Sequence, residues 1–235
     1  MNPSKTTARI AGVLYLFLII LGVFSLMYVP GKIIDWSNPE VTAENIIIFG
    51  SLFKAGFIAN VLSNITWLFL AFAFRELFLP VNKKLADLIV IFVLAGTIIM
   101  CISALNQYAV MQLLSGKKYL DVFDTGQLHA LSMFFIELYY GGDLIASIFF
   151  GLWLLPLGYL TYKSEYLPRI LGVFLMIGCF GYLGEFFGRA FFPGYYSSGI
   201  DNFIALPADA GELGICFWLL IRGVKSRSPD ARKSK

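Results

Sequence analysis

Ionisable side chains inside apolar stretches are the residues of this sequence that could do chemistry. Glu185 and Arg189 interrupt an apolar stretch of bilayer length, 169–192, and stand one helical turn apart. Charged groups at membrane depth are costly, so they usually face the protein interior, pair with each other, or mark a functional path. The pattern therefore predicts either an internal Glu185–Arg189 ion pair or a site that uses both charges to bind something.

Other apolar stretches carry polar side chains at a comparable depth, counted inward from the helix ends at about 1.5 Å per residue. These side chains are Asn60, Asn64, Asn106, Glu137, Asp143, Asp209 and Glu212. If they faced inward together with Glu185 and Arg189, they would line one outward-opening cavity with several carboxylates and a buried arginine. We therefore take them as candidate ligand-binding residues, with Asp209 expected instead to cap a helix that begins after Pro207.

Geometry restricts this predicted cavity. Glu137 and Asp143 are separated by roughly 240° around a helix, so both can point to one centre only if Gly141 and Gly142 distort it.

Several classes of site are excluded or unsupported. With His129 as the single histidine, a three-His zinc centre is impossible. The three cysteines form no CxxC pair and are expected to pack as small apolar residues. The sequence contains no G-x-S-x-G, HExxH, phosphate-loop or dinucleotide motif. We expect no metal site and no cofactor.

Composition explains why these charges stand out. The 235 residues are 58% hydrophobic and only 14% charged, and the mean hydropathy is +0.76, which is typical of a membrane protein. The net charge of +3 comes from Lys and Arg near helix ends, so we expect no nucleic-acid partner. The fold class is therefore an all-α polytopic membrane protein.

We predict a bundle of six transmembrane helices in one domain, 10–224, between a cytoplasmic N-terminus, 1–9, and a basic tail, 225–235. The predicted spans are 10–29, 52–74, 85–114, 125–162, 169–192 and 203–221. The fourth is too long for one straight crossing, so its first turns should stand outside or it should bend at Gly141 and Gly142.

Local signals place the ends and faces of several helices. Ser37 and Glu40 have the spacing of a capping box for a short surface helix, and Asp124 can cap the fourth span together with Gln127. In the fifth span, glycines recur at helical spacing and predict a bare face for close helix packing. These glycines are Gly178, Gly181, Gly184 and Gly188.

Basic residues predict the orientation. With the N-terminus inside, the short inner loops and both termini hold most Lys and Arg, whereas the outer loops hold only Lys32, Lys117 and Lys118. Both termini are therefore expected in the cytoplasm.

Four segments resemble the bacterial domain-of-unknown-function family 4386. They are 9–22 (RIAGVLYLFLIILG), 79–85 (LPVNKKL), 150–173 (FGLWLLPLGYLTYKSEYLPRILGV) and 207–224 (PADAGELGICFWLLIRGV). The resemblance covers nearly the whole chain, and YLPRILGV is its most specific part. It implies a multi-pass bacterial inner-membrane protein and supplies no activity or catalytic residue.

Three functions remain open. The chain could bind or transport a small polar or amphipathic ligand, with Arg189 meeting an anionic group. It could be a structural or regulatory subunit whose polar residues join helices. It could be an intramembrane enzyme acting on a lipid, which no residue spacing favours. The expected partners are membrane lipids, a small-molecule ligand and a second copy of the chain in a homo-oligomer.

Overall fold

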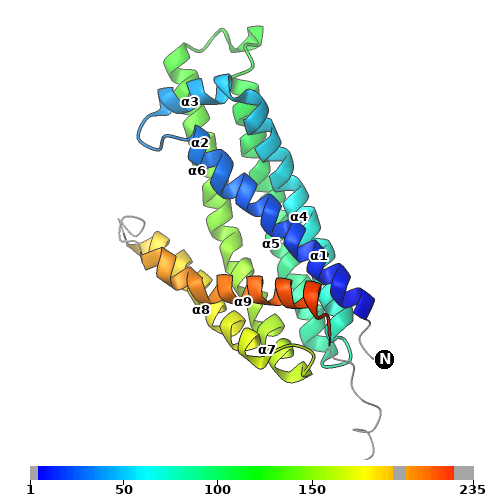
Figure 1. Cartoon of the computed structure of the whole chain (residues 1–235). Coiled ribbons are helices and arrows are strands. Elements are labelled where there is room, and N and C mark those ends of the chain that lie inside the picture. Colours follow the sequence, from blue (N-terminus) through cyan, green and yellow to red (C-terminus); the bar gives the residue numbers. More distant parts are fainter. Residues whose placement is uncertain (1–4, 193–199, 225–235) are drawn as a thin grey trace, which may run out of the picture. The chain divides into compact units, whose positions relative to one another are not determined.

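The computed structural model describes residues 5–192 and 200–224, so the predicted basic tail and the first four residues lie outside the described part. Throughout the described residues the regular structure is helical (Figure 1). Six segments are long and apolar enough to cross a membrane, as the sequence predicted. They are Lys5–Ile33, Gly50–Phe78, Lys83–Leu113, Thr125–Ser164, Arg169–Phe191 and Phe203–Ile221.

The first span consists of three consecutive helices. It begins as α1 (Lys5–Gly22), passes through a π-helix, η1 (Val23–Tyr28), and ends as α2 (Val29–Ile33). The helix therefore starts inside the segment predicted as a non-membrane N-terminus. Further along the chain, α4 (Gly50–Phe78) and α5 (Lys83–Leu113) are single long helices.

The chain forms two compact units. Unit 1 contains Met1–Leu16, Trp67–Gly96 and Ser147–Lys235, and unit 2 contains Phe17–Thr66 and Thr97–Ala146. Four helices, α1, α4, α5 and α6 (Thr125–Leu152), run through both units, whereas α7 (Leu154–Ser164), α8 (Arg169–Phe191) and α9 (Ile200–Ile221) belong to unit 1 alone.

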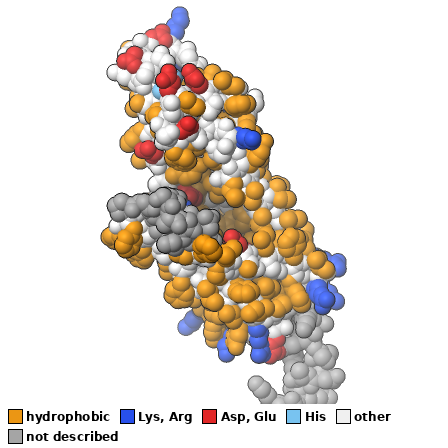
Figure 2. Space-filling model, turned by 60° about the vertical axis from the view of Figure 1, so that its left-hand side comes forward, with side chains coloured by type: hydrophobic (Ala, Val, Ile, Leu, Met, Phe, Trp, Pro, Cys, Tyr) orange, Lys and Arg blue, Asp and Glu red, His pale blue; other side chains and the backbone are white. Residues whose placement is uncertain are grey.

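Large apolar side chains cover much of the surface. Figure 2 shows hydrophobic side chains spread over most of the face in view. Ile102 is 62% exposed, Phe180 68% and Phe203 75%, although each lies in a candidate membrane span. In water such a surface would be costly, whereas lipid tails solvate it. Together with the six apolar helices, it indicates a multi-pass membrane protein.

The long fourth span is interrupted at Trp153. There α6 ends and α7 begins, while α6 passes through Gly141 and Gly142 as an unbroken helix. The predicted bend at these glycines stays a prediction, and the interruption that the structure shows lies at Trp153. Pro156 explains the observed position, because it has no N–H for the carbonyl of Leu152 and its ring crowds that carbonyl.

One predicted helix cap is confirmed. The backbone N–H of Gln127 donates to the Asp124 carboxylate at 2.8 Å, and the backbone N–H of Asp124 donates to the Gln127 side chain at 3.0 Å. The two residues form a reciprocal capping box at the start of α6.

The other predicted cap is wrong by one residue. The side chain of Asn38, not Ser37, accepts hydrogen bonds at the start of α3 (Pro39–Ile48), from the backbone N–H groups of Glu40 and Val41. Ser37 instead donates through its hydroxyl and its N–H to the carboxylate of Asp35, and these bonds lower the pKa of Asp35.

The predicted glycine face of α8 is confirmed at two positions. A Cβ on Gly178 would lie 2.7 Å from the Cα of Ala208, and one on Gly181 would lie 2.6 Å from the carbonyl oxygen of Ile204. These glycines let α8 and α9 approach backbone to backbone. At Gly184 no described atom of a neighbouring helix lies within 4 Å of such a Cβ.

Candidate functional site

The structure divides the predicted site residues between the two units. Unit 2 contains five of them: Asn60, Asn64, Asn106, Glu137 and Asp143. Unit 1 contains Glu185, Arg189 and Glu212. The predicted cavity uniting all eight stays a prediction, and each unit has its own local arrangement.

In unit 2, Asn60 is the centre of a buried hydrogen-bond network. Its amide nitrogen donates to the phenol oxygen of Tyr139, which joins α4 to α6. The amide nitrogen of Asn64 donates to the side-chain oxygen of Asn60 at 2.8 Å and to its backbone carbonyl at 2.9 Å. All three side chains are buried, with Asn60 and Tyr139 only 1% exposed. In lipid, such a network holds helices together and fixes the orientation of the phenol.

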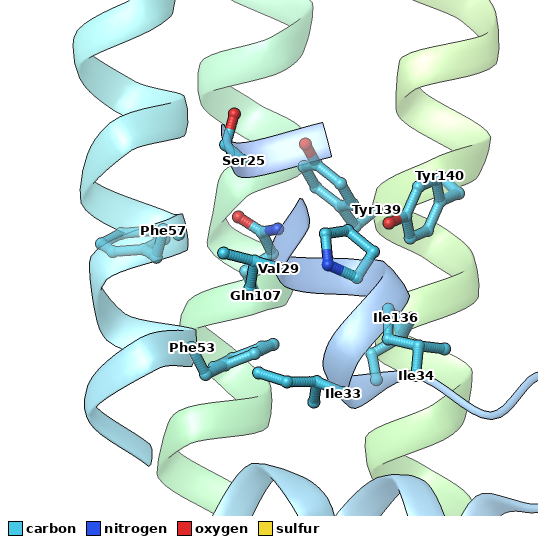
Figure 3. A pocket seen from close by; sticks show the side chains of 12 residues that line it. Ser25, Val29, Ile33, Ile34, Phe53, Phe57, Gln107, Ile136, Tyr139 and Tyr140 are labelled. Carbon is cyan, nitrogen blue, oxygen red and sulfur yellow. The ribbon is translucent and has the colours of Figure 1, made fainter. Parts of the chain in front are cut away.

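Beside this network lies a small cavity within unit 2. Its volume is about 20 Å³, which is room for a single water-sized group. Figure 3 shows Gln107 from α5 and Tyr139 from α6 among the side chains around it. The lining comprises Ser25, Val29, Pro30, Ile33, Ile34, Phe53, Gly56, Phe57, Gln107, Ile136, Tyr139 and Tyr140.

The cavity has an apolar side and a polar side. Ile33, Phe53 and Ile136 belong to the buried apolar cluster of unit 2. On the polar side, the side-chain oxygen of Gln107 is buried and has no hydrogen-bond partner among the described residues. Leaving a buried acceptor unpaired costs about 1–3 kcal/mol. An unpaired acceptor at a cavity wall is therefore a position where a hydrogen-bond donor would be stabilised.

Tyr139 supplies the complementary group. Its oxygen accepts the bond from Asn60, which leaves its own O–H hydrogen available to donate. The cavity therefore offers an unpaired acceptor on Gln107 and a donor on Tyr139. A hydroxyl group matches both, because it donates one hydrogen bond and accepts another.

The end of the first span lines one side of the cavity, through Ser25 of η1 and through Val29, Pro30 and Ile33 of α2. The backbone N–H of Val29 bonds to the carbonyl of Phe24, five residues back, instead of the carbonyl of Ser25. Pro30 follows and has no N–H to continue the series. Ser25, which is 4% exposed, points its hydroxyl back to the Gly22 carbonyl at 3.4 Å. Short π-helical turns within α-helices occur often at functional sites.

The remaining predicted residues of unit 2 do not line this cavity. Asp143 lies near Tyr139, one turn further along α6. Asn106 is half-buried, and Glu137 is exposed, in keeping with its predicted separation from Asp143 around the helix. The carboxylates of α6 therefore do not converge on one point.

In unit 1, Glu185 and Arg189 form the predicted ion pair on α8. The Glu185 side chain is 23% exposed and the Arg189 side chain is 18% exposed, so the ion pair is partly shielded from its surroundings. This pairing within one helix favours a structural role for the two charges, although both residues also have further interactions. A role in binding stays a prediction.

Glu212 has a different partner. The buried phenol of Tyr15 on α1 faces the carboxyl of Glu212 on α9, although the two groups fall short of a regular hydrogen bond. Pro207 lies inside α9, which already begins at Ile200, so the predicted cap at Asp209 is wrong. Asp209 is instead an exposed carboxyl one turn before Glu212.

No group of three His, Cys, Asp or Glu side chains that could hold a metal ion occurs in the described part of the chain. The cysteines are free thiols, and Cys179 and Cys216 are buried as expected, whereas Cys101 is exposed.

As site residues, sequence reasoning missed Gln107, Ser25, Tyr139 and Tyr15. A search for charges in apolar stretches overlooks hydroxyl groups, because tyrosine and serine are common in membrane helices. Pro30 was a usable signal, since a proline near the end of a span marks irregular backbone.

Comparison with known proteins identifies the sequence family and no activity. The family model described as "Domain of unknown function (DUF4386)" matches residues 10–223. A protein of Archaeoglobus fulgidus, named only as an uncharacterized protein, is 35% identical over 109 residues, which is 46% of this chain and 60% of that protein. The chain thus aligns with less than two thirds of that relative. No solved structure matches.

Proposed function

Since the chain belongs to the DUF4386 family, a family of unknown function, we propose a function from its own residues: it is a membrane protein that binds the hydroxyl end of a small amphipathic molecule in the cavity of unit 2. The unpaired side-chain oxygen of Gln107 at the cavity wall is the observation that carries this proposal.

The size of the cavity restricts the ligand. Sites that enclose a whole small molecule measure about 300–1,000 Å³, whereas this one measures about 20 Å³. Only one small group of the ligand enters it. The buried side chains of Ile33, Phe53 and Ile136 give the cavity an apolar side next to its polar groups.

The charge of the cavity restricts the ligand further. None of its described lining residues is ionisable at neutral pH. A carboxylate or an ammonium would lose its hydration without gaining a counter-ion, which is costly in an apolar site. A neutral hydroxyl avoids this cost while pairing with Gln107 and Tyr139. An amphipathic alcohol is therefore the class of ligand that we propose.

Binding is tested with 1-decanol as the probe and Trp36 as the reporter. The Trp36 ring packs edge-on against Tyr140, which lines the cavity, with ring centroids 4.9 Å apart. In nanodiscs, protein labelled with 5-fluorotryptophan should show a saturable change of the Trp36 ¹⁹F resonance with decanol. Decane and decanoate should leave it unchanged. The Trp36→Phe variant assigns the resonance.

Gln107→Met should abolish the decanol response, because methionine keeps the side-chain volume and removes the acceptor. Gln112→Met is the matched control on α5, since the Gln112 side chain lies outside the cavity and pairs with Lys117. Thermal unfolding checks the fold: Gln107→Met should be at least as stable as the wild type, because an unpaired buried acceptor is removed. A decanol response that survives in Gln107→Met contradicts the proposal.

We further propose that both termini are cytoplasmic, that the protein resides in the plasma membrane, and that the cavity lies in the outer half of the bilayer. The excess of Lys and Arg in the loops that then face the cytoplasm supports this orientation. With the N-terminus inside, the segments of α4, α5 and α6 that belong to unit 2 are those nearer the outer surface.

Cysteine labelling tests this orientation. In a Cys101→Ala background, Val122→Cys should react in intact cells with a membrane-impermeant maleimide, since Val122 is 80% exposed in a predicted outer loop. Lys84→Cys, in a predicted inner loop, is the matched control and should react only after lysis. The reverse pattern would show that the termini face outward.

A further inference from the structure

Glu212 and Tyr15 form a second buried polar pair in unit 1 that the proposed ligand site does not use. Tyr15 is fully buried, and its hydroxyl has no regular hydrogen-bond partner among the described residues. The phenol faces the half-buried carboxyl of Glu212. Both groups lie within candidate membrane spans. A carboxyl and a phenol brought together there need a physical explanation.

Close packing of α1 on α9 fixes this pair. A Cβ on Gly12 would lie 2.9 Å from the backbone nitrogen of Leu220, so only glycine permits the observed approach. The thiol of Cys216 donates to the Gly12 carbonyl at 3.7 Å in the same contact. Tyr15 follows Gly12 by one turn, and Glu212 precedes Cys216 by one turn. The helices therefore hold the two polar groups face to face.

Aromatic rings hold the Tyr15 side chain in place. The Phe74 ring packs edge-on against it at 5.8 Å, and the Trp153 ring lies 6.2 Å away, both measured between centroids. Such contacts restrict rotation of the phenol. Its hydroxyl therefore stays directed at Glu212 instead of turning toward another acceptor.

Among the described residues, Glu212 has no cationic partner. None of the described Lys, Arg or His side chains forms an ion pair with it. The ionisable groups around the pair are Asp209 and Cys216 on α9 and Tyr182 on α8, none of which carries positive charge. An unpaired carboxylate in an apolar environment is costly, and taking up a proton removes that cost.

A phenol can pair with both forms of a carboxyl group. It donates its hydrogen to the charged carboxylate, and its oxygen accepts the hydrogen of the neutral acid. A lysine would pair only with the charged carboxylate, and a carbonyl oxygen would pair only with the neutral acid. Tyrosine therefore allows Glu212 to bind and release a proton without leaving an unpaired group.

We propose that Glu212, positioned by Tyr15, is a proton-binding site inside the membrane-spanning part of unit 1. The reaction is reversible protonation of the Glu212 carboxylate. In this proposal Tyr15 donates to the charged carboxylate and accepts from the neutral acid, and it keeps its own proton. This site is independent of the alcohol-binding cavity of unit 2, and each can fail without the other.

Dicyclohexylcarbodiimide tests the proposal, because it is lipid-soluble and reacts with protonated carboxyl groups. Protein in nanodiscs, incubated with the reagent at a series of pH values, should gain one adduct that peptide mass spectrometry locates on Glu212. Labelling should fall as the pH rises and the carboxyl loses its proton. A water-soluble carbodiimide at equal concentration should label Glu212 at least tenfold less.

Two variants provide the controls. Glu212→Gln should remove the adduct, whereas Asp209→Asn should keep it, since Asp209 is the exposed carboxyl one turn away. Should Glu212→Gln fail to fold, the position of the adduct and its pH dependence in the wild type and in Asp209→Asn still decide the question. An unlabelled Glu212, or labelling that does not change with pH, overturns the proposal.

Discussion

Gly172→Ala is expected to lower the free energy of unfolding by about 3 kcal/mol, at the upper end of what overpacking costs. A Cβ at Gly172 would lie 2.5 Å from the carbonyl oxygen of Gly158 and 2.8 Å from the backbone nitrogen of Tyr162. Both are backbone atoms, so no side-chain rotation relieves the contact. α7 and α8 would have to separate, and the contacts around Gly158 would be lost with them.

Denaturation of the purified protein by SDS in mixed micelles measures this loss. Gly184→Ala is the matched control on α8, because no described atom of another helix lies within 4 Å of the added methyl group. It should be neutral or slightly stabilising, since alanine has the higher helix propensity. Equal stabilities for the two variants would show that the α7–α8 contact is looser than the structure describes.

Asn60→Leu is expected to destabilise the protein by about 2 kcal/mol. A single hydrogen bond between membrane helices contributes on average only about 0.6 kcal/mol. Stranding a buried polar group costs more, about 1–3 kcal/mol, and here the Tyr139 oxygen loses its donor while Asn64 loses one acceptor. The stranded groups, rather than the bond itself, determine the expected magnitude.

A double-mutant cycle separates these two contributions. Adding Tyr139→Phe to Asn60→Leu removes the stranded hydroxyl and should restore at least half of the lost stability, measured by the same SDS denaturation. A loss near 0.6 kcal/mol in the single variant, with no recovery in the double variant, would mean that the network is an ordinary interhelical contact. Asn106→Leu is a control, because Asn106 lies outside the network and the cavity lining.

The sequence predicted most of the fold because each span is set by a strong local signal. Long apolar stretches bounded by Lys and Arg placed all six candidate spans, and Asp124 with Gln127 marked the start of α6. Predictions went wrong where neighbouring residues compete. Asn38 caps α3 in place of Ser37, whose hydroxyl donates to Asp35. No sequence signal was used to place the interruption at Trp153, beside Pro156.

The site was less predictable, because it depends on which side chains meet across helices. Asn60 and Asn64 could be identified as a pair from their spacing, but their partner Tyr139 lies 79 residues after Asn60 in the sequence. No periodicity links those positions. In the same way, Glu212 was recognised as a buried acid, whereas the phenol facing it belongs to the first span.

The π-helix η1 sets the rotational phase of the first span. Ser25, Val29 and Ile33 are buried, and they follow one another at intervals of four residues. In a regular α-helix each such step turns the side chain by about 40°, so the three would fan out across the surface. The wider turn of η1 offsets part of that drift. Inserting one further residue between Val23 and Tyr28 would rotate the two sides of the turn by about 100° relative to each other, whereas deleting one would let the wide turn close to a regular α-helical turn. Insertions in this short segment therefore threaten the cavity more than most substitutions in its lining.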